Sequence, residues 1–247
     1  MSNTGDVNRI KNRIRRQVWE KMEKLEIATS PRPCYGKIPN FIGSLNASNK
    51  IVKLDMFRKA RVIYSTIDLP QKPIREETLR RDKILITSMP KVRGFIILDP
   101  SRIDKRMISY ATTVRGSLRM GERIRILEDI RIDLVVLGSV AVTRNGARLG
   151  KGDGQYDLEY ALLRELHVID ENTPVVTTVH DVQIVDDIPM LRHDVPADIV
   201  ATPSQLIFTK TPYRKPSGIY WEMLSIEEIK SNPILRQLFG ITYERIR

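Results

Sequence analysis

Residues 133–157 read DLVVLGSVAVTRNGARLGKGDGQYD, and this stretch decides the fold class. It opens with a continuous apolar run at 133–138, which suits a strand buried on both faces of a sheet. It closes just before a helical pattern at 156–167, with a loop in which glycines alternate with charged residues: Gly150, Lys151, Gly152, Asp153 and Gly154. A buried strand followed by a glycine-rich loop and a helix is typical of an α/β protein.

Strand-like and helical patterns alternate on both sides of this stretch. Short apolar and β-branched runs predict strands at 61–65, 83–87, 94–100, 133–138, 174–179 and 198–203. Apolar residues spaced three and four apart, together with capping signals, predict helices at 9–25, 45–58, 74–81, 156–167 and 225–239. The stretch 102–132 is long, basic and partly helical. The alternation predicts one α/β domain over residues 1–247, with a mainly parallel sheet flanked by helices, an N-terminal helix and a C-terminal helical tail.

The composition excludes several classes of protein. The chain is 41% apolar and 29% charged, and its 13 Gly and 14 Pro exclude a collagen-like or wholly disordered chain. No apolar run reaches the roughly 20 residues that span a bilayer. The opening residues lack the apolar core of a signal peptide, and the single cysteine, Cys34, cannot form an internal disulfide. We therefore expect a cytoplasmic protein.

The charge balance favours anionic partners. Lys and Arg number 41 against 30 Asp and Glu, which leaves a formal net charge of +11. Such a surface attracts nucleic acid, nucleotides or a polyanionic substrate, although it can equally serve solubility alone.

The glycine loop is a candidate phosphate site. Glycines let backbone N–H groups turn inward, and the following helix adds a partial positive charge at its N-terminus. Arg148 and Lys151 would add full charges on the same anion. The loop matches neither the P-loop nor the dinucleotide fingerprint, and a plain turn is the alternative that the pattern leaves open.

Two further groups of residues could serve the same anion. Lys11 and Arg15 lie four apart on one face of the first helix, where a bound anion would relieve their mutual repulsion; a solvated basic face is the alternative. Asp157 and Asp198 could hold a nucleotide-bound Mg²⁺, since this ion takes one or two carboxylates besides phosphate oxygens. Asp157 could instead complement the helix dipole.

Three segments together resemble the 5-formyltetrahydrofolate cyclo-ligase family. They are KNRIR at 11–15, the stretch 133–157, and HDVPADIVATP at 193–203. The middle stretch is the most specific, because it is similar to the family's strand and its G-x-R-L-G-x-G-x-G-[YF]-Y-D signature. The N-terminal third resembles a divergent branch that includes the methenyltetrahydrofolate synthase domain-containing proteins.

This resemblance implies a fold, a reaction and a set of site residues. The fold would be similar to the ribose-5-phosphate isomerase and CoA-transferase superfamily. ATP, with Mg²⁺, would phosphorylate the formyl oxygen of 5-formyltetrahydrofolate, after which N10 attacks and phosphate leaves as the 5,10-methenyl ring closes. By motif, Lys11, Arg15, Arg148 and Lys151 would be catalytic, and Asp157 and Asp198 would ligate Mg²⁺. The nucleotide would contact Lys11, Arg15, Arg148, Leu149, Gly150, Lys151, Gly152, Asp153, Gly154, Gln155 and Tyr156.

The residues expected to contact the folate match the family's pattern less closely than those expected to contact the nucleotide. Arg15, Tyr64 and Tyr156 would contact the pterin, but Gln155 replaces one of the family's paired aromatic residues. Leu69 stands where the family has a Glu that grips the pterin, and the adjacent Asp68 is the candidate replacement. A changed pterin or lost catalysis therefore stays open. The rival hypotheses are a non-catalytic nucleotide- or RNA-binding relative and a kinase-like or phosphatase-like activity on another anion.

Overall fold

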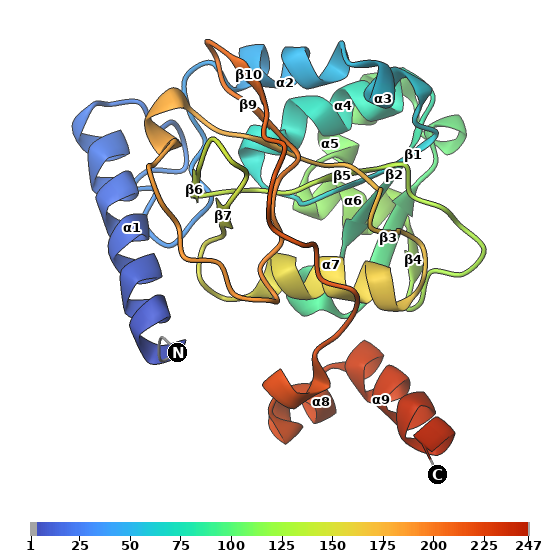
Figure 1. Ribbon diagram of the computed structural model, residues 1–247. Helices are drawn as coiled ribbons and strands as arrows, with labels where there is room; N and C mark the ends of the chain where they lie inside the picture. The colour runs from blue at the N-terminus through green and yellow to red at the C-terminus, as the bar shows by residue number, and fades with distance from the viewer. Residues whose placement is uncertain (1–3, 247) are drawn as a thin grey trace.

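The computed structural model describes residues 4–246, built around one large twisted sheet (Figure 1). Within these residues the sheet has eight strands in the order β10-β9-β8-β5-β1-β2-β3-β4. Their bounds are β1 (Val62–Ser65), β2 (Ile84–Ser88), β3 (Phe95–Leu98), β4 (Glu122–Ile124), β5 (Leu134–Val136), β8 (Val175–Thr178), β9 (Ile199–Ala201) and β10 (Leu206–Phe208). A separate hairpin joins β6 (Ala141–Val142) to β7 (Arg148–Leu149).

The centre of the sheet is parallel and its edges are antiparallel. Strands β9, β8, β5, β1 and β2 pair in parallel, with Ile63 of β1 opposite Leu134 of β5. Strands β3, β4 and β10 are added antiparallel at the edges. The predicted mainly parallel α/β sheet is confirmed. The two edge strands β4 and β10 were missed: β4 reads ERI and carries no apolar run, and β10 is an apolar run of only three residues, LIF.

The chain reverses its direction of travel across the sheet between β1 and β5. After β1 the chain adds β2 and β3 on one side, and after β5 it adds β8 and β9 on the other. The carboxyl ends of β1 and β5 therefore flank a topological switch point, where open α/β sheets bind their ligands.

Helices cover both faces of the sheet (Figure 1). They are α1 (Thr4–Lys24), α2 (Ser44–Val52), α3 (Asp55–Lys59), α4 (Lys72–Arg80), α5 (Ile108–Ala111), α6 (Val114–Met120), α7 (Gln155–Glu165), α8 (Ile226–Ser231) and α9 (Pro233–Ile246). Alternate strand residues point to opposite faces. Ile63 accordingly belongs to a core under α1 and α2, whereas Tyr64 belongs to a second core under α7. Short 3-10 turns lie at Leu69–Gln71, Pro90–Val92, Pro100–Arg102, Lys105–Met107, Asp181–Gln183 and Trp221–Met223.

Two predicted helices are each divided in two. The stretch 45–58 breaks at Leu54, whose extended backbone caps α3. The predicted helix 225–239 begins as expected, with a capping box between Ser225 and Glu228, but stops at Asn232. Pro233 forces this break, because a residue before proline disfavours the helical conformation and proline has no N–H to donate.

None of the helices within residues 4–246 is long and apolar enough to cross a membrane.

Candidate active site

The glycine loop lies between a hairpin and the start of a helix. The β6–β7 hairpin ends at Leu149, and the loop 150–154 then leads directly into α7. Gly152 and Gly154 have φ values of 109° and 68°, a region that side chains with a Cβ rarely adopt. This backbone path therefore favours glycine at 152 and 154, and the loop lies at the positive end of the α7 dipole.

Helix α1 lies against this loop and brings two cations to it. Lys11 is buried on the same face of α1 as Val7, Val18 and Met22, and its ammonium group pairs with Asp194. Arg15, one turn further along, donates from Nε to the carbonyl oxygen of Gly150 at 2.8 Å. The two predicted cations of α1 therefore both lie at the glycine loop.

Arg15 and Gly152 fit closely against each other. A Cβ added to Gly152 would lie 3.2 Å from Cζ of Arg15, so the small residue leaves room for the guanidinium group. Burial lowers the pKa of Arg15, while the nearby carboxylates of Asp194 and Asp157 act in the opposite direction. Arg15 stays cationic, since a free guanidinium has a pKa above 12.

These residues surround a cavity of about 110 Å³, which we call the loop cavity. Its lining consists of Asn8, Lys11, Arg15, residues 148–157, His193 and Asp194. Every residue that the sequence assigned to the nucleotide thus lies on one cavity. Tyr64, Asp68 and Asp198 are not part of its lining.

Arg148 is fixed by the protein itself. Its side chain is fully buried, and it donates to the carbonyl oxygens of Val195 and Gly138, both at 2.9 Å, and to the carboxylate of Asp157. These bonds tie the hairpin to the loop around Val195 and to the end of β5. Arg148 therefore positions the cavity wall, and its predicted contact with phosphate stays a prediction.

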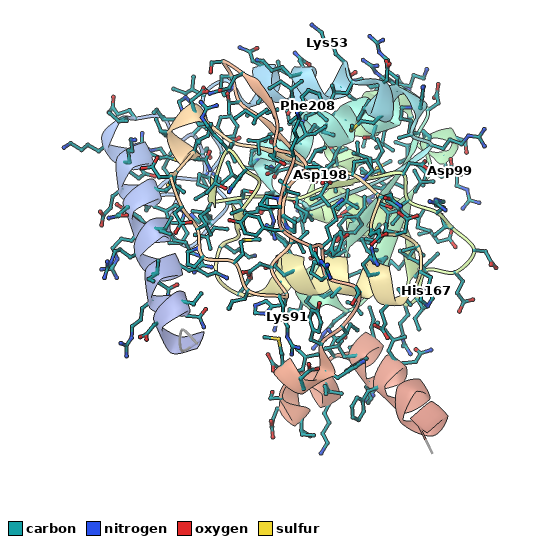
Figure 2. The ribbon with its side chains drawn as sticks, in the orientation of Figure 1. Lys53, Lys91, Asp99, His167, Asp198 and Phe208 are labelled. Atoms are coloured by element: carbon teal, nitrogen blue, oxygen red, sulfur yellow. The ribbon has the colours of Figure 1, made fainter. Side chains whose placement is uncertain are left out.

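The two predicted magnesium ligands lie in different surroundings. Asp157 is on the loop cavity, where it accepts from Arg148 and from the backbone N–H of Val195 at 3.1 Å. Asp198 instead accepts from Lys215 and from the N–H of Val175, both at 2.7 Å. It lines a different cavity, which shares Asp194 with the loop cavity but none of the glycine-loop residues, and Figure 2 shows it in the middle of the body, away from α1. The structure does not bring Asp198 to the glycine loop.

Two residues at the loop cavity were not singled out from the sequence. Asp194 is buried there, where it accepts from Lys11 and from the N–H of Leu191 at 2.5 Å. The adjacent His193 has a buried Nδ1 atom with no hydrogen-bond partner among the described residues. Both belong to HDVPADIVATP, in which the sequence analysis chose Asp198, four residues later. The signal was present, but only the packing of α1 identifies which carboxylate meets the loop.

A second acidic group lies at the switch point between β1 and β5. Asp68 follows β1, and its Oδ2 accepts from the hydroxyl of Tyr156 at 2.6 Å. Gly138 follows β5, and a Cβ there would lie only 2.6 Å from the same Oδ2. Burial raises the pKa of Asp68, while the Tyr156 hydroxyl and Arg75 partly oppose that shift. The fully buried Arg75 donates to the backbone carbonyl oxygens of Thr66, Ile67 and Asp68, which fixes this loop.

Glu159 is a buried acid that the sequence analysis missed. It is completely buried on α7 and accepts from Tyr64 at 2.5 Å, from Ser88 at 2.6 Å and from Gln155 at 2.8 Å. Burial raises the pKa of Glu159 and also that of Tyr64. Tyr64, a predicted pterin contact, is therefore held inside the second core, and its hydroxyl is engaged by Glu159.

Comparison with known protein families matches the model of the 5-formyltetrahydrofolate cyclo-ligase family over residues 7–203. The matched range includes α1, the glycine loop, Asp194 and the switch point. The chain belongs to the 5-formyltetrahydrofolate cyclo-ligase family. The part beyond residue 203, which holds β10, α8 and α9, lies outside the matched range.

The chain is also similar to curated relatives from animals. It is 36% identical over 237 residues to a methenyltetrahydrofolate synthase domain-containing protein of Danio rerio, and 38% identical over 234 residues to one of Homo sapiens. These alignments cover 94% and 92% of this chain but only 62% and 61% of the relatives. The chain thus spans about three-fifths of the length of the relatives that it matches.

A solved structure shares the fold. The NMR structure of Aquifex aeolicus 5,10-methenyltetrahydrofolate synthetase superposes with a TM-score of 0.52 and 18% identity, covering 81% of this chain and 93% of that one. The α/β architecture of this cyclo-ligase family member therefore matches that of a methenyltetrahydrofolate synthetase.

Proposed function

We propose that this protein is a cytoplasmic cyclo-ligase that converts 5-formyltetrahydrofolate, or a related formylated pterin, to the 5,10-methenyl form with ATP and Mg²⁺. The observation that carries this proposal is the loop cavity, in a chain that belongs to the cyclo-ligase family. A glycine loop at a helix N-terminus, with Lys11, Arg15 and Lys151 around it, has the shape and charge that a polyphosphate requires.

The cations would act on the charge of the transferring phosphoryl group. Phosphoryl transfer needs alignment and charge stabilisation more than covalent help from the protein. Lys151 is three-quarters buried, pairs with Asp153 at 3.0 Å and lies 5.2 Å from the ring centre of Tyr156. Lys151 therefore connects the loop with Tyr156, whose hydroxyl donates to Asp68. The formyl oxygen would attack the γ-phosphorus of ATP and release ADP, and the phosphate would leave later, when N10 closes the ring.

The donor set at the loop cavity fits Mg²⁺. This ion prefers hard oxygen ligands and takes one or two carboxylates in addition to phosphate oxygens. Asp157 and Asp194 both line the loop cavity, so we assign the predicted magnesium role to this pair, with Asp194 in place of Asp198. Lys11, which now neutralises Asp194, would then turn its charge to the phosphates.

The switch point is the proposed pterin site. Pterin rings present several N–H donors, from which a half-buried carboxylate such as Asp68 can accept hydrogen bonds. The Tyr156 hydroxyl fixes the orientation of Asp68 in advance. Asp68 would thus replace the family's Glu, although it lies one residue before the expected position at Leu69.

An absorbance assay tests this function. The purified protein is mixed with 5-formyltetrahydrofolate and MgATP, and absorbance is followed at the band of the methenyl product. We expect growth that depends on ATP and falls by at least about a hundredfold in Lys151→Ala, the usual scale for removing a charge-stabilising group. Lys53→Ala is the matched control, because Lys53 is an exposed residue just after α2, at the top of the view in Figure 2 and outside the lining of the loop cavity, and its loss should leave the rate unchanged.

The alternative is a non-catalytic nucleotide- or RNA-binding relative. It predicts ATP binding without product, or RNA binding whose affinity falls with salt at a log–log slope of about −0.7 per phosphate contact. Product formation by the wild-type protein and no salt-dependent RNA binding would exclude it.

A further inference from the structure

A second cavity adjoins the loop cavity and is walled by the C-terminal part of the chain. It measures about 230 Å³, and we call it the C-terminal cavity. Four residues line both cavities: Asp153, Gly154, Asp157 and His193. A group bound in the C-terminal cavity would therefore lie directly next to a phosphate held by the glycine loop.

The lining of the C-terminal cavity is mostly apolar. Leu158 and Ala161 of α7 form one wall, while Ile219, Tyr220, Met223 and Leu224 form the facing wall. Its volume is below the roughly 300–1,000 Å³ typical of sites for whole drug-sized ligands. The cavity suits one flat heteroaromatic group of a larger ligand whose charged part lies elsewhere.

The facing wall is held rigidly in place. The N–H of Ile219 donates to Oε2 of Glu165 at 3.0 Å, which ties this segment to the end of α7. The guanidinium group of Arg192 lies 4.6 Å from the ring centre of Tyr220. Asn232 donates to the carbonyl oxygen of Val92 at 3.0 Å and caps the start of α9. Figure 1 shows the resulting arrangement, with α8 and α9 below α7.

We propose that the C-terminal cavity binds the base of the nucleoside triphosphate whose phosphates lie on the glycine loop. The base-binding wall then comes from residues 219–224, outside the range 7–203 that matches the family model. This inference rests on the proposed nucleotide site, and it adds that the C-terminal segment completes that site and provides affinity for the base. His193, which lines both cavities, is the polar side chain at their boundary and would contact the sugar or base.

The test compares ATP with inorganic triphosphate, each with Mg²⁺, by titration calorimetry on the full chain. The wild-type protein should bind ATP more tightly than triphosphate. Ala161→Leu, which fills the cavity, should weaken ATP binding roughly tenfold, the scale of a misfit of one or two methylenes in an apolar pocket, and should leave triphosphate binding unchanged.

A second variant changes a partly exposed side chain, so it should not disturb the folding of the protein. Met223 is 43% exposed at the cavity wall, and Met107, far along the chain on the turn Lys105–Met107, is 41% exposed. Met223→Asn should reduce the preference for ATP over triphosphate, whereas the matched control Met107→Asn should not.

Each outcome has a separate meaning. If the wild-type protein binds neither compound, the proposed nucleotide site is wrong. If it binds both equally, or if Ala161→Leu and Met223→Asn keep the full preference for ATP, the phosphate site stands and the base lies elsewhere, which overturns this inference.

Discussion

Lys11 and Asp194 form a buried ion pair between residues that are 183 positions apart in the chain. Their side chains are only 4% and 8% exposed. Removing one partner of such a pair leaves an uncompensated buried charge, at a cost of about 3–5 kcal/mol. We therefore expect Lys11→Met to lower the free energy of unfolding by about that amount in urea denaturation. The double variant Lys11→Met/Asp194→Asn should recover part of the loss.

A matched control lies on the same helix. Lys21 is exposed, so Lys21→Met should change the free energy of unfolding by less than about 0.5 kcal/mol. Equal losses in Lys11→Met and Lys21→Met, or simple additivity in the double variant, would contradict the buried pair.

Glu159 predicts a pH dependence of stability. Burial raises the pKa of Glu159 above its ordinary value of 4.5, so the folded protein holds this proton more tightly than the unfolded chain does. Its contribution to stability is therefore full below pH 4.5 and is lost as the pH rises through the raised pKa. Glu159→Gln removes this titration. The stability of the wild-type protein relative to Glu159→Gln should fall as the pH rises from 4.5, measured by urea unfolding at each pH. Parallel stability curves would argue against it.

Of the predicted site residues, the structure brings the cations and the glycines of the loop to one cavity, but only one of the two carboxylates, Asp157. Lys11, Arg15 and Lys151 were recognisable because they stand in or beside short motifs. Asp194 was not, since choosing it over Asp198 needs the position of α1 against the loop. Glu159 lies inside a helical pattern, where the sequence marks only Gln155, four residues earlier, as a neighbour; the donors Tyr64 and Ser88 come from other elements.

At the scale of elements, the glycine loop makes a prediction with a matched control. Gly154 and Gly36 have φ values of 68° and 70°, and a Cβ on either would meet no atom within 4 Å. Each change to Ala should cost about 1–2 kcal/mol of stability through backbone strain alone. Only Gly154→Ala should also weaken ATP binding, because it alters the backbone at the phosphate. Equal ATP affinity in both variants would remove the loop from the site.

Element types were predicted more securely than their ends and partners. The strands 61–65 and 133–138 were identified from buried apolar runs, which short local windows contain. The break at Pro233 could also have been predicted, because proline ends a helix at the preceding residue. By contrast, β4 and β10 are only three residues long, and a window that short does not distinguish a strand from a loop.

At the scale of the whole molecule, the order of the strands brings the parts of the candidate site together. The switch point between β1 and β5 brings Asp68 close to Gly138, and the hairpin after β5 turns the glycine loop toward α1. The proposed pterin site and the proposed phosphate site therefore become neighbours, with Tyr156 between them. The sequence predicted a parallel sheet, but the order of its strands depends on long-range packing that local patterns do not encode.

The most direct test of the central claim follows one oxygen atom. The substrate 5-formyltetrahydrofolate, labelled with ¹⁸O in its formyl group, is turned over with MgATP, and the released phosphate is analysed by mass spectrometry. Phosphorylation of the formyl oxygen, followed by ring closure, transfers that oxygen to phosphate. We predict one ¹⁸O in each phosphate released together with the methenyl product. Unlabelled phosphate, or ATP bound at the loop without any methenyl product, would contradict the proposed reaction.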